Sequence, residues 1–118
     1  MVIRTRSIGQ ARPGDLATYR LGSLRAFEDG RVFAPSAPLL AAYKSGKLSW
    51  EAYERAYLAE MTALYQRTPD RFVALHRRAE VALVCYEAGP ARCHRRLLAE
   101  LLARVAAERH IAVTLDIR

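Results

Sequence analysis

The chain has 118 residues, of which 52% are hydrophobic and 26% are charged, and its formal net charge is +7. This length suits one domain and is short for two, so we expect a single α/β domain over residues 1–118. The composition permits a buried core, which excludes global disorder. No apolar run approaches about 18 residues, so we expect neither a transmembrane helix nor a membrane partner.

Cysteine usage and the N-terminal residues bear on location. Residues Met1 to Arg6 lack the apolar stretch of a secretory signal, so we expect a cytoplasmic protein. A reducing cytoplasm disfavours a structural disulfide, so Cys85 and Cys93 are interpreted as thiols or metal ligands. The positive charge comes mostly from Arg, whose fork matches phosphate and carboxylate and favours an anionic partner. An Arg-rich composition with no such partner is the alternative, since the basic residues are scattered along the chain.

The N-terminal third predicts short elements separated by loops. Residues Val2–Ile8 partly alternate between apolar and polar and predict a first strand. Residues 11–31 are mostly loop, with Leu16–Leu21 as a candidate second strand. Ser36 is placed to cap a helix. The buried side of that helix is expected to hold Leu39, Leu40 and Tyr43.

Two helices are expected in the middle of the chain. Ser49 is placed to cap the first, which should reach about Gln66. Thr68 and Pro69 then predict a cap and the first position of a second, short helix. Steps of three and four residues assign the buried positions. These are Trp50, Tyr53, Tyr57, Met61 and Leu64 in the first helix, and Phe72, Leu75 and Ala79 in the second.

The C-terminal third predicts a strand–helix–strand unit. The apolar run Val81–Tyr86 is typical of a strand covered on both faces, Ala91–Arg109 is helical, and Ile111–Ile117 is a closing strand. We therefore expect a three-layer α/β sandwich, with a short and mainly parallel sheet of three or four strands and helices on both faces. The first strand and the strands at Val81 and Ile111 should form its core.

The loop from Cys85 to Arg95 concentrates chemically active side chains. Ligands in parallel sheets bind at the carboxyl ends of strands, near helix N-termini. Cys85 lies near the carboxyl end of the most buried strand, and Cys93, His94 and Arg95 fall in the first turn of the next helix, so they should meet at one crevice. The unpaired backbone N–H groups of that turn, with nearby Arg side chains, would suit phosphate, sulfate or carboxylate.

The same electrostatic field would hold Cys93 partly as thiolate, with His94 or Glu87 carrying the proton. The leading hypothesis is a small enzyme or binding protein for an anionic, phosphate- or nucleotide-like ligand. The candidate catalytic residues are Cys85, Glu87, Cys93 and His94. The candidate anion-binding residues are Arg92, Arg95 and, from the end of the first strand, Arg6 and Ser7.

Several alternatives stay open. Cys85 also fits a core position, and His94 a hydrogen bond to a carbonyl. Cys85, Cys93 and His94 offer three zinc ligands, but adjacent ligands strain a tetrahedral site and no fourth is evident, so no metal is predicted. A non-catalytic nucleic-acid accessory module and a thiol redox or metal-capture site are the alternative functions. Whether the protein is an enzyme, its cofactor and its oligomeric state stay undetermined.

The loop resembles the signature of the domain of unknown function 488 family. The resemblance implies a compact three-layer α/β fold, a bacterial or archaeal origin, a site at the Cys-x-Glu and Cys-His-Arg residues, and no settled activity. Residues 11–32 match least, and the chain lacks the Asp-Val-Arg segment of longer members. The matching segments are Leu83–Glu87, Pro90 and Cys93–Arg95, together with Arg4–Gly9, Ala34–Ser36, Tyr43–Gly46 and Tyr57–Met61.

Overall fold

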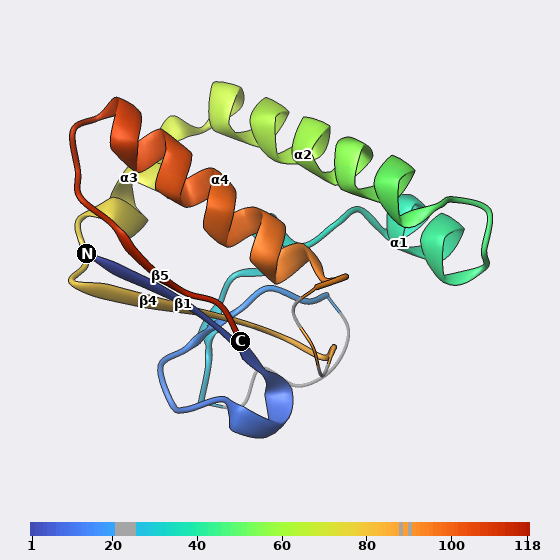
Figure 1. Cartoon of the computed structure of the whole chain (residues 1–118), viewed down its shortest axis with the longest axis horizontal. Coiled ribbons are helices and arrows are strands. Elements are labelled where there is room, and N and C mark those ends of the chain that lie inside the picture. The colour runs from blue at the N-terminus through green and yellow to red at the C-terminus, as the bar shows by residue number, and fades with distance from the viewer. Residues whose placement is uncertain (21–25, 88, 90) are drawn as a thin grey trace.

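The computed structural model describes residues 1–20, 26–87, 89 and 91–118 (Figure 1). Leu21 of the candidate second strand and Pro90 of the signature segment lie outside these residues. Within the described ranges, five parallel strands form one sheet in the order β3-β2-β4-β1-β5. The strands are β1 (Val2–Ser7), β2 (Leu16–Ala17), β3 (Glu28–Asp29), β4 (Glu80–Cys85) and β5 (Thr114–Asp116).

Four α-helices accompany the sheet in the described part of the chain. They are α1 (Ala37–Lys44), α2 (Trp50–Arg67), α3 (Pro69–His76) and α4 (His94–Glu108), with two 3₁₀ turns, η1 (Ile8–Gln10) and η2 (Arg31–Phe33). None of these helices is long and apolar enough to cross a membrane. The predicted α/β class and parallel sheet are confirmed.

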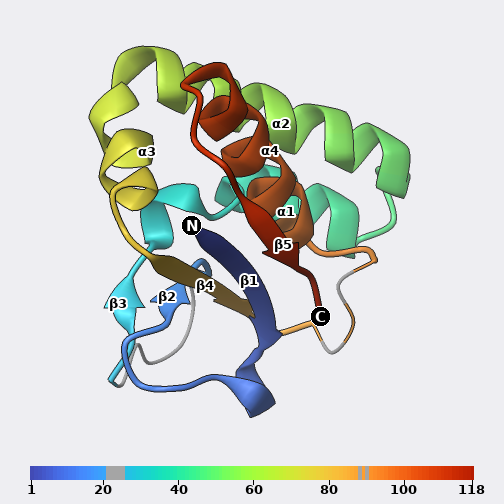
Figure 2. The same ribbon diagram turned by 60° about the vertical axis from the view of Figure 1, so that its left-hand side comes forward.

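The sheet has more strands than the three or four predicted, and the strands at its centre are not all those expected. β4 pairs with both β1 and β2, so it is interior (Figure 2). The predicted closing strand is shortened to β5, which pairs only with β1 in the described ranges and forms an edge. Its Leu115 is 41% exposed. The expectation that this strand is part of the core is therefore wrong, because β5 lies at the sheet edge and its side chains are exposed or half-buried.

The main core lies between the sheet and the helices. Ile3, Val81 and Leu83 belong to one hydrophobic cluster with the buried leucines of α4. Figure 1 shows the α-helices gathered on one side of β1 and β4. On the other face, Val84 packs with Ala17 and Tyr19 beneath Ile8 of η1. Among the described residues, the helical element that packs on this second face is the 3₁₀ turn η1.

Helix boundaries follow the local signals with two corrections. Ser36 and Ser49 cap α1 and α2 through hydrogen bonds from Leu39 N and Ala52 N. Thr68 is the N-cap residue of α3, as predicted, but its side chain accepts no cap hydrogen bond; its hydroxyl donates to the Leu64 carbonyl at the end of α2 instead. The last helix begins at His94 and not at Ala91, and Cys93 is its N-cap residue. Ala79, expected to face inward, is exposed.

Candidate functional site

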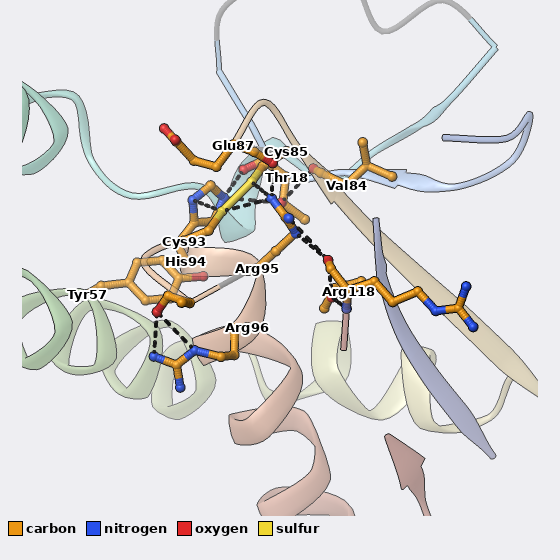
Figure 3. Close-up of a disulfide and its surroundings, with 12 residues drawn as sticks. Thr18, Tyr57, Val84, Cys85, Glu87, Cys93, His94, Arg95, Arg96 and Arg118 are labelled. Atoms are coloured by element: carbon orange, nitrogen blue, oxygen red, sulfur yellow. Dashed lines mark hydrogen bonds between the residues drawn. A yellow bond between two sulfur atoms is a disulfide. The ribbon is translucent and has the colours of Figure 1, made fainter. Parts of the chain in front are cut away.

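The two ends of the predicted loop meet at the carboxyl edge of the sheet (Figure 3). Cys85 is the last residue of β4, and Cys93 stands directly before α4. Their Cα atoms are 7.8 Å apart, and both side chains are buried. The convergence expected from a parallel strand followed by a helix is thus present.

The two sulfur atoms are joined. The structure places Cys85 and Cys93 in a disulfide, whereas the sequence led us to expect two separate thiols or metal ligands. Both side chains point across the gap between the end of β4 and the start of α4, so their sulfurs come into contact. Any reaction of these cysteines therefore starts from the two residues together, in their disulfide-bonded form.

Arg95 lies behind the sulfurs and is completely buried. Its Nη1 donates to Cys85 Sγ at 3.0 Å, to Cys93 Sγ at 3.4 Å and to the Glu87 carbonyl at 2.6 Å. Burial lowers the pKa of Arg95 from its ordinary value, and the Glu87 charge acts in the opposite direction. A guanidinium so placed stabilises negative charge on either sulfur.

The Arg95 side chain is held from its other side by Arg118. The backbone oxygen of Arg118 accepts hydrogen bonds from Nε and Nη2 of Arg95 at 3.3 and 3.1 Å. Thr5 of β1 exchanges two hydrogen bonds with the Arg118 backbone, at 2.8 and 3.1 Å. The segment after β5 therefore orients the guanidinium toward the sulfurs.

His94 is buried and points toward the end of β2. Its Nε2 lies 2.5 Å from the Thr18 carbonyl, so this nitrogen carries the hydrogen and donates it. Nδ1 is then unprotonated, and it lies 4.0 Å from Cys93 Sγ. The pKa of His94 is lowered to about 4, mainly by burial and also by the nearby Arg95 charge, although the Thr18 hydrogen bond and the Glu87 charge act in the opposite direction. The imidazole is therefore neutral at pH 7, with its unprotonated Nδ1 on the side of Cys93.

A cavity of about 320 Å³ opens beside the sulfurs. Both cysteines and His94 line it, so they are buried from bulk water yet face this space. Glu87 lies at its mouth, where its carboxylate pairs with Lys44 Nζ at 2.9 Å. The remaining lining residues are Tyr19, Arg20, Ala34, Pro35, Leu40, Tyr43, Tyr53, Tyr86 and Arg92.

Three predicted anion-binding residues are not in this cavity lining. Arg95 faces the sulfurs from behind. Arg6 binds both oxygens of Asp15 at 2.9 and 2.8 Å and borders a separate polar pocket. Ser7 is paired with Cys85 in the register of β1 and β4 but does not line the cavity. Of the four predicted anion-binding residues, only Arg92 faces the cavity.

Several lining residues were not among the predicted site residues. Tyr43 and Tyr53, on α1 and α2, had been assigned to buried helix faces, and Tyr19 follows β2. Helical spacing indicates burial but does not distinguish a packed core from a cavity wall. Thr18 and Tyr19 follow β2, which ends at Ala17, whereas the candidate strand ran on to Leu21 and so placed both residues inside a strand.

Fold and site together define an α/β protein with a paired-cysteine site at the carboxyl end of its central parallel strand. The chain belongs to the DUF488 family, since the family model DUF488-N3a, described as the active DUF488-N3 subclade, matches residues 17–106. This match includes Cys85, Cys93 and His94 and confirms the resemblance seen in the sequence. Neither the curated proteins nor the solved structures contain a match to the chain.

Proposed function

We propose that this protein is a thiol-dependent enzyme for a small anionic ligand, with Cys93 as its reactive thiol. The observation that carries the proposal is the environment of the sulfurs. One buried guanidinium nitrogen donates to both of them, and a neutral imidazole presents its unprotonated nitrogen to Cys93. These neighbours stabilise a thiolate and accept its proton, which is what a cysteine nucleophile needs.

Cys93 is favoured over Cys85 as the nucleophile by its place in the fold. It precedes the first turn of α4, where the helix dipole is positive and favours an anion. It is also the cysteine that lies beside His94 Nδ1. Cys85 is then the partner thiol, which closes on Cys93 when both are oxidised.

The disulfide is the oxidised form of this site in the proposal. Two equivalents of an external thiol reduce it, releasing Cys85 and Cys93 as thiols and forming one external disulfide. The enzyme therefore works where thiols stay reduced, in agreement with the cytoplasmic location expected from the sequence.

The remaining residues take roles that follow from their positions. His94 Nδ1 accepts the Cys93 proton as Sγ bonds to an electrophilic atom of the ligand. The electron pair of the broken bond leaves with the departing group, which takes that proton back from His94. Glu87, at the cavity mouth, is a second proton carrier. Arg92 holds the ligand anion at the mouth, and Arg95 stabilises the sulfur anion.

The test is the pH dependence of Cys93 alkylation in the reduced protein. Iodoacetamide labelling, followed by mass spectrometry, should show a midpoint below about 7.5, against about 8.5 for a free thiol. Arg95→Gln should move this midpoint up by about one unit, because the thiolate loses its cationic donor. Arg96→Gln is the matched control, since Arg96 bonds Glu100 and the Ala91 carbonyl.

A wild-type midpoint near that of a free thiol, unchanged by Arg95→Gln, would overturn the proposal. Because Arg95 is buried, its variant is first checked for a wild-type circular dichroism spectrum. His94→Gln provides a second variant, in which the amide replaces the Nε2 donor to Thr18 but offers no nitrogen base to Cys93.

A metal centre is the second candidate. The donor atoms of Cys85, Cys93 and His94 lie within 4.8 Å of one another, and the Thr18 hydrogen bond leaves His94 Nδ1 available. Three protein ligands with an open position facing a cavity are typical of catalytic zinc. One equivalent of zinc that survives dialysis of the reduced protein, and is lost in Cys85→Ser, would favour this candidate over the thiol enzyme.

A further inference from the structure

We infer that the ligand of this cavity is a nucleotide, whose base stacks on the tyrosine walls and whose phosphate lies at the basic mouth. The inference rests on the proposed function for the site, and it adds the class of ligand. It is carried by the shape and chemistry of the lining, and not by the sulfurs themselves.

The first observation is the aromatic lining. Tyr19 and Tyr86 follow β2 and β4, and their ring centroids are 4.6 Å apart. Tyr43 and Tyr53 come from α1 and α2, and their ring centroids are also 4.6 Å apart. The cavity thus has an aromatic pair from the strand ends and another from the helices. Such side chains stack against planar rings, and every nucleobase presents a planar ring.

Tyr86 is the most informative of the four tyrosines. It is 51% exposed, although most large apolar side chains of the described residues are buried or half-buried. An exposed aromatic ring at the mouth of a cavity is poised to cover a bound ring and lose that exposure. This position follows the buried strand β4 directly, so the ring is held on a rigid support.

The second observation is the charge at the mouth. Three cationic side chains, those of Arg20, Lys44 and Arg92, line the cavity, and Glu87 is the only acid in its described lining. Lys44 pairs with Glu87, while the Arg92 side chain forms no hydrogen bond or ion pair with the described residues. The mouth therefore carries excess positive charge, which suits a phosphate group.

The size and the lining of the cavity together restrict the class of ligand that fits it. About 320 Å³ lies at the small end of ligand pockets, so it accommodates one ring system with a sugar and not a large cofactor. A sugar phosphate offers no planar ring to the tyrosines of the lining, and a neutral ring offers no anion to the three cations at the mouth. A nucleotide satisfies both parts of the lining at once.

The test compares ligands that differ by one part of a nucleotide. Isothermal titration of the reduced full chain uses adenosine monophosphate, uridine monophosphate, adenosine, ribose 5-phosphate and inorganic phosphate. The monophosphates should bind at least about tenfold more tightly than ribose 5-phosphate, since stacking is worth about 1–3 kcal/mol per base. Equal affinity for ribose 5-phosphate and the monophosphates would overturn the inference.

Matched variants separate the two contacts. Tyr86→Ala should weaken monophosphate binding about tenfold, while Tyr86→Phe keeps the ring and the affinity. Arg92→Ala should weaken the monophosphates but leave adenosine unchanged. Because Tyr86 and Arg92 are exposed, folding should survive these changes. Unchanged monophosphate affinity in Tyr86→Ala would count against stacking and overturn the inference.

Two further arms identify the source of the nucleotide and keep the inference separate from the thiol chemistry. A single-stranded tetranucleotide that binds tenfold more tightly than the monophosphates would show a nucleotide within a strand; weaker binding would show a free one. Cys93→Ser should retain monophosphate binding. If the monophosphates bind as expected but Cys93 is alkylated with the midpoint of a free thiol, the thiol enzyme is refuted and the nucleotide site is not. If the alkylation midpoint is lowered but binding does not depend on the base, the nucleotide site is refuted and the thiol enzyme is not.

Discussion

Three consecutive residues at the start of α4 act in three directions. Cys93 is extended and faces Cys85, His94 turns to the Thr18 carbonyl, and Arg95 turns inward beneath both sulfurs. Successive side chains of a helical turn point about 100° apart, so adjacent residues reach different neighbours. This divergence lets one turn supply a nucleophile, a proton acceptor and a cation without mutual obstruction.

The burial of His94 predicts an acid-sensitive fold. Its pKa is lowered to about 4, so the folded protein resists protonation while the unfolded chain takes up a proton near pH 6.5. Stability contributed by the neutral imidazole is fully present above about pH 6.5 and is lost as the pH falls toward 4. The expected loss is up to about 3 kcal/mol from this residue.

Urea unfolding at pH 7, 6, 5 and 4 measures this effect. His94→Gln keeps a donor to Thr18 and has no titrating group, so its stability should fall less steeply than that of the wild type. His76 is also buried, and its pKa is lowered too, so the stability of the variant should still fall to some extent as the pH is lowered. Equal slopes for variant and wild type would contradict the assignment of a buried neutral His94.

At the scale of elements, the strand order decides which side chains stabilise the fold. β4 lies between β1 and β2 and carries Leu83, which is fully buried, whereas β5 lies at the edge with Leu115 partly exposed. Leu83→Ala removes atoms from the main core and leaves a cavity. Leu115→Ala removes atoms that already contact water.

We therefore expect Leu83→Ala to lower the free energy of unfolding by about 2–5 kcal/mol. Leu115→Ala, the matched control in the same sheet, should cost less than about 1 kcal/mol. Urea denaturation with a reductant present compares the two. Similar losses in both variants would mean that β5 is part of the core after all, as its sequence pattern had suggested.

The helices beside the cavity are joined by a polar contact as well as by packing. The Ser36 backbone N and side-chain hydroxyl, at the start of α1, both donate to the Glu60 carboxylate of α2. Tyr57 of α2 donates to the Phe33 carbonyl at 2.7 Å. These contacts hold α1 and α2 in position, so Tyr43 and Tyr53 can form one wall of the cavity.

For the whole molecule, the net charge of +7 is spread over the surface and many cations are already paired. Paired and scattered Arg side chains favour weak, non-specific attraction to polyanions over a dedicated nucleic-acid surface. The cationic cavity mouth is a local feature within this general charge.

Duplex DNA of mixed sequence should accordingly bind weakly and lose its affinity between about 50 and 200 mM salt. Cys93→Ser should bind with the same affinity, because the attraction involves no thiol. Fluorescence anisotropy of a labelled duplex measures both proteins. Sequence-selective binding that survives 200 mM salt would instead support the nucleic-acid accessory module considered from the sequence.

Much of the local structure was predictable from the residues alone. The strands at Val2 and Val81 and the caps at Ser36 and Ser49 follow from periodicity and capping chemistry. The edge position of β5 was not predictable, because its apolar pattern resembles that of a core strand. Strand order depends on pairing between distant segments, and here β1 pairs with β4 and β5 across most of the chain.

The sequence by itself determined that Cys85, Cys93 and His94 would meet, since a short connection from a parallel strand to its following helix brings both ends to one edge. Only the tertiary structure decided that Arg95 faces the sulfurs, that Arg6 pairs with Asp15 elsewhere, and that tyrosines from α1 and α2 complete the cavity. Neighbouring residues share a local geometry that their order dictates. Contacts between remote segments depend on how complete elements pack, and no local pattern specifies that packing.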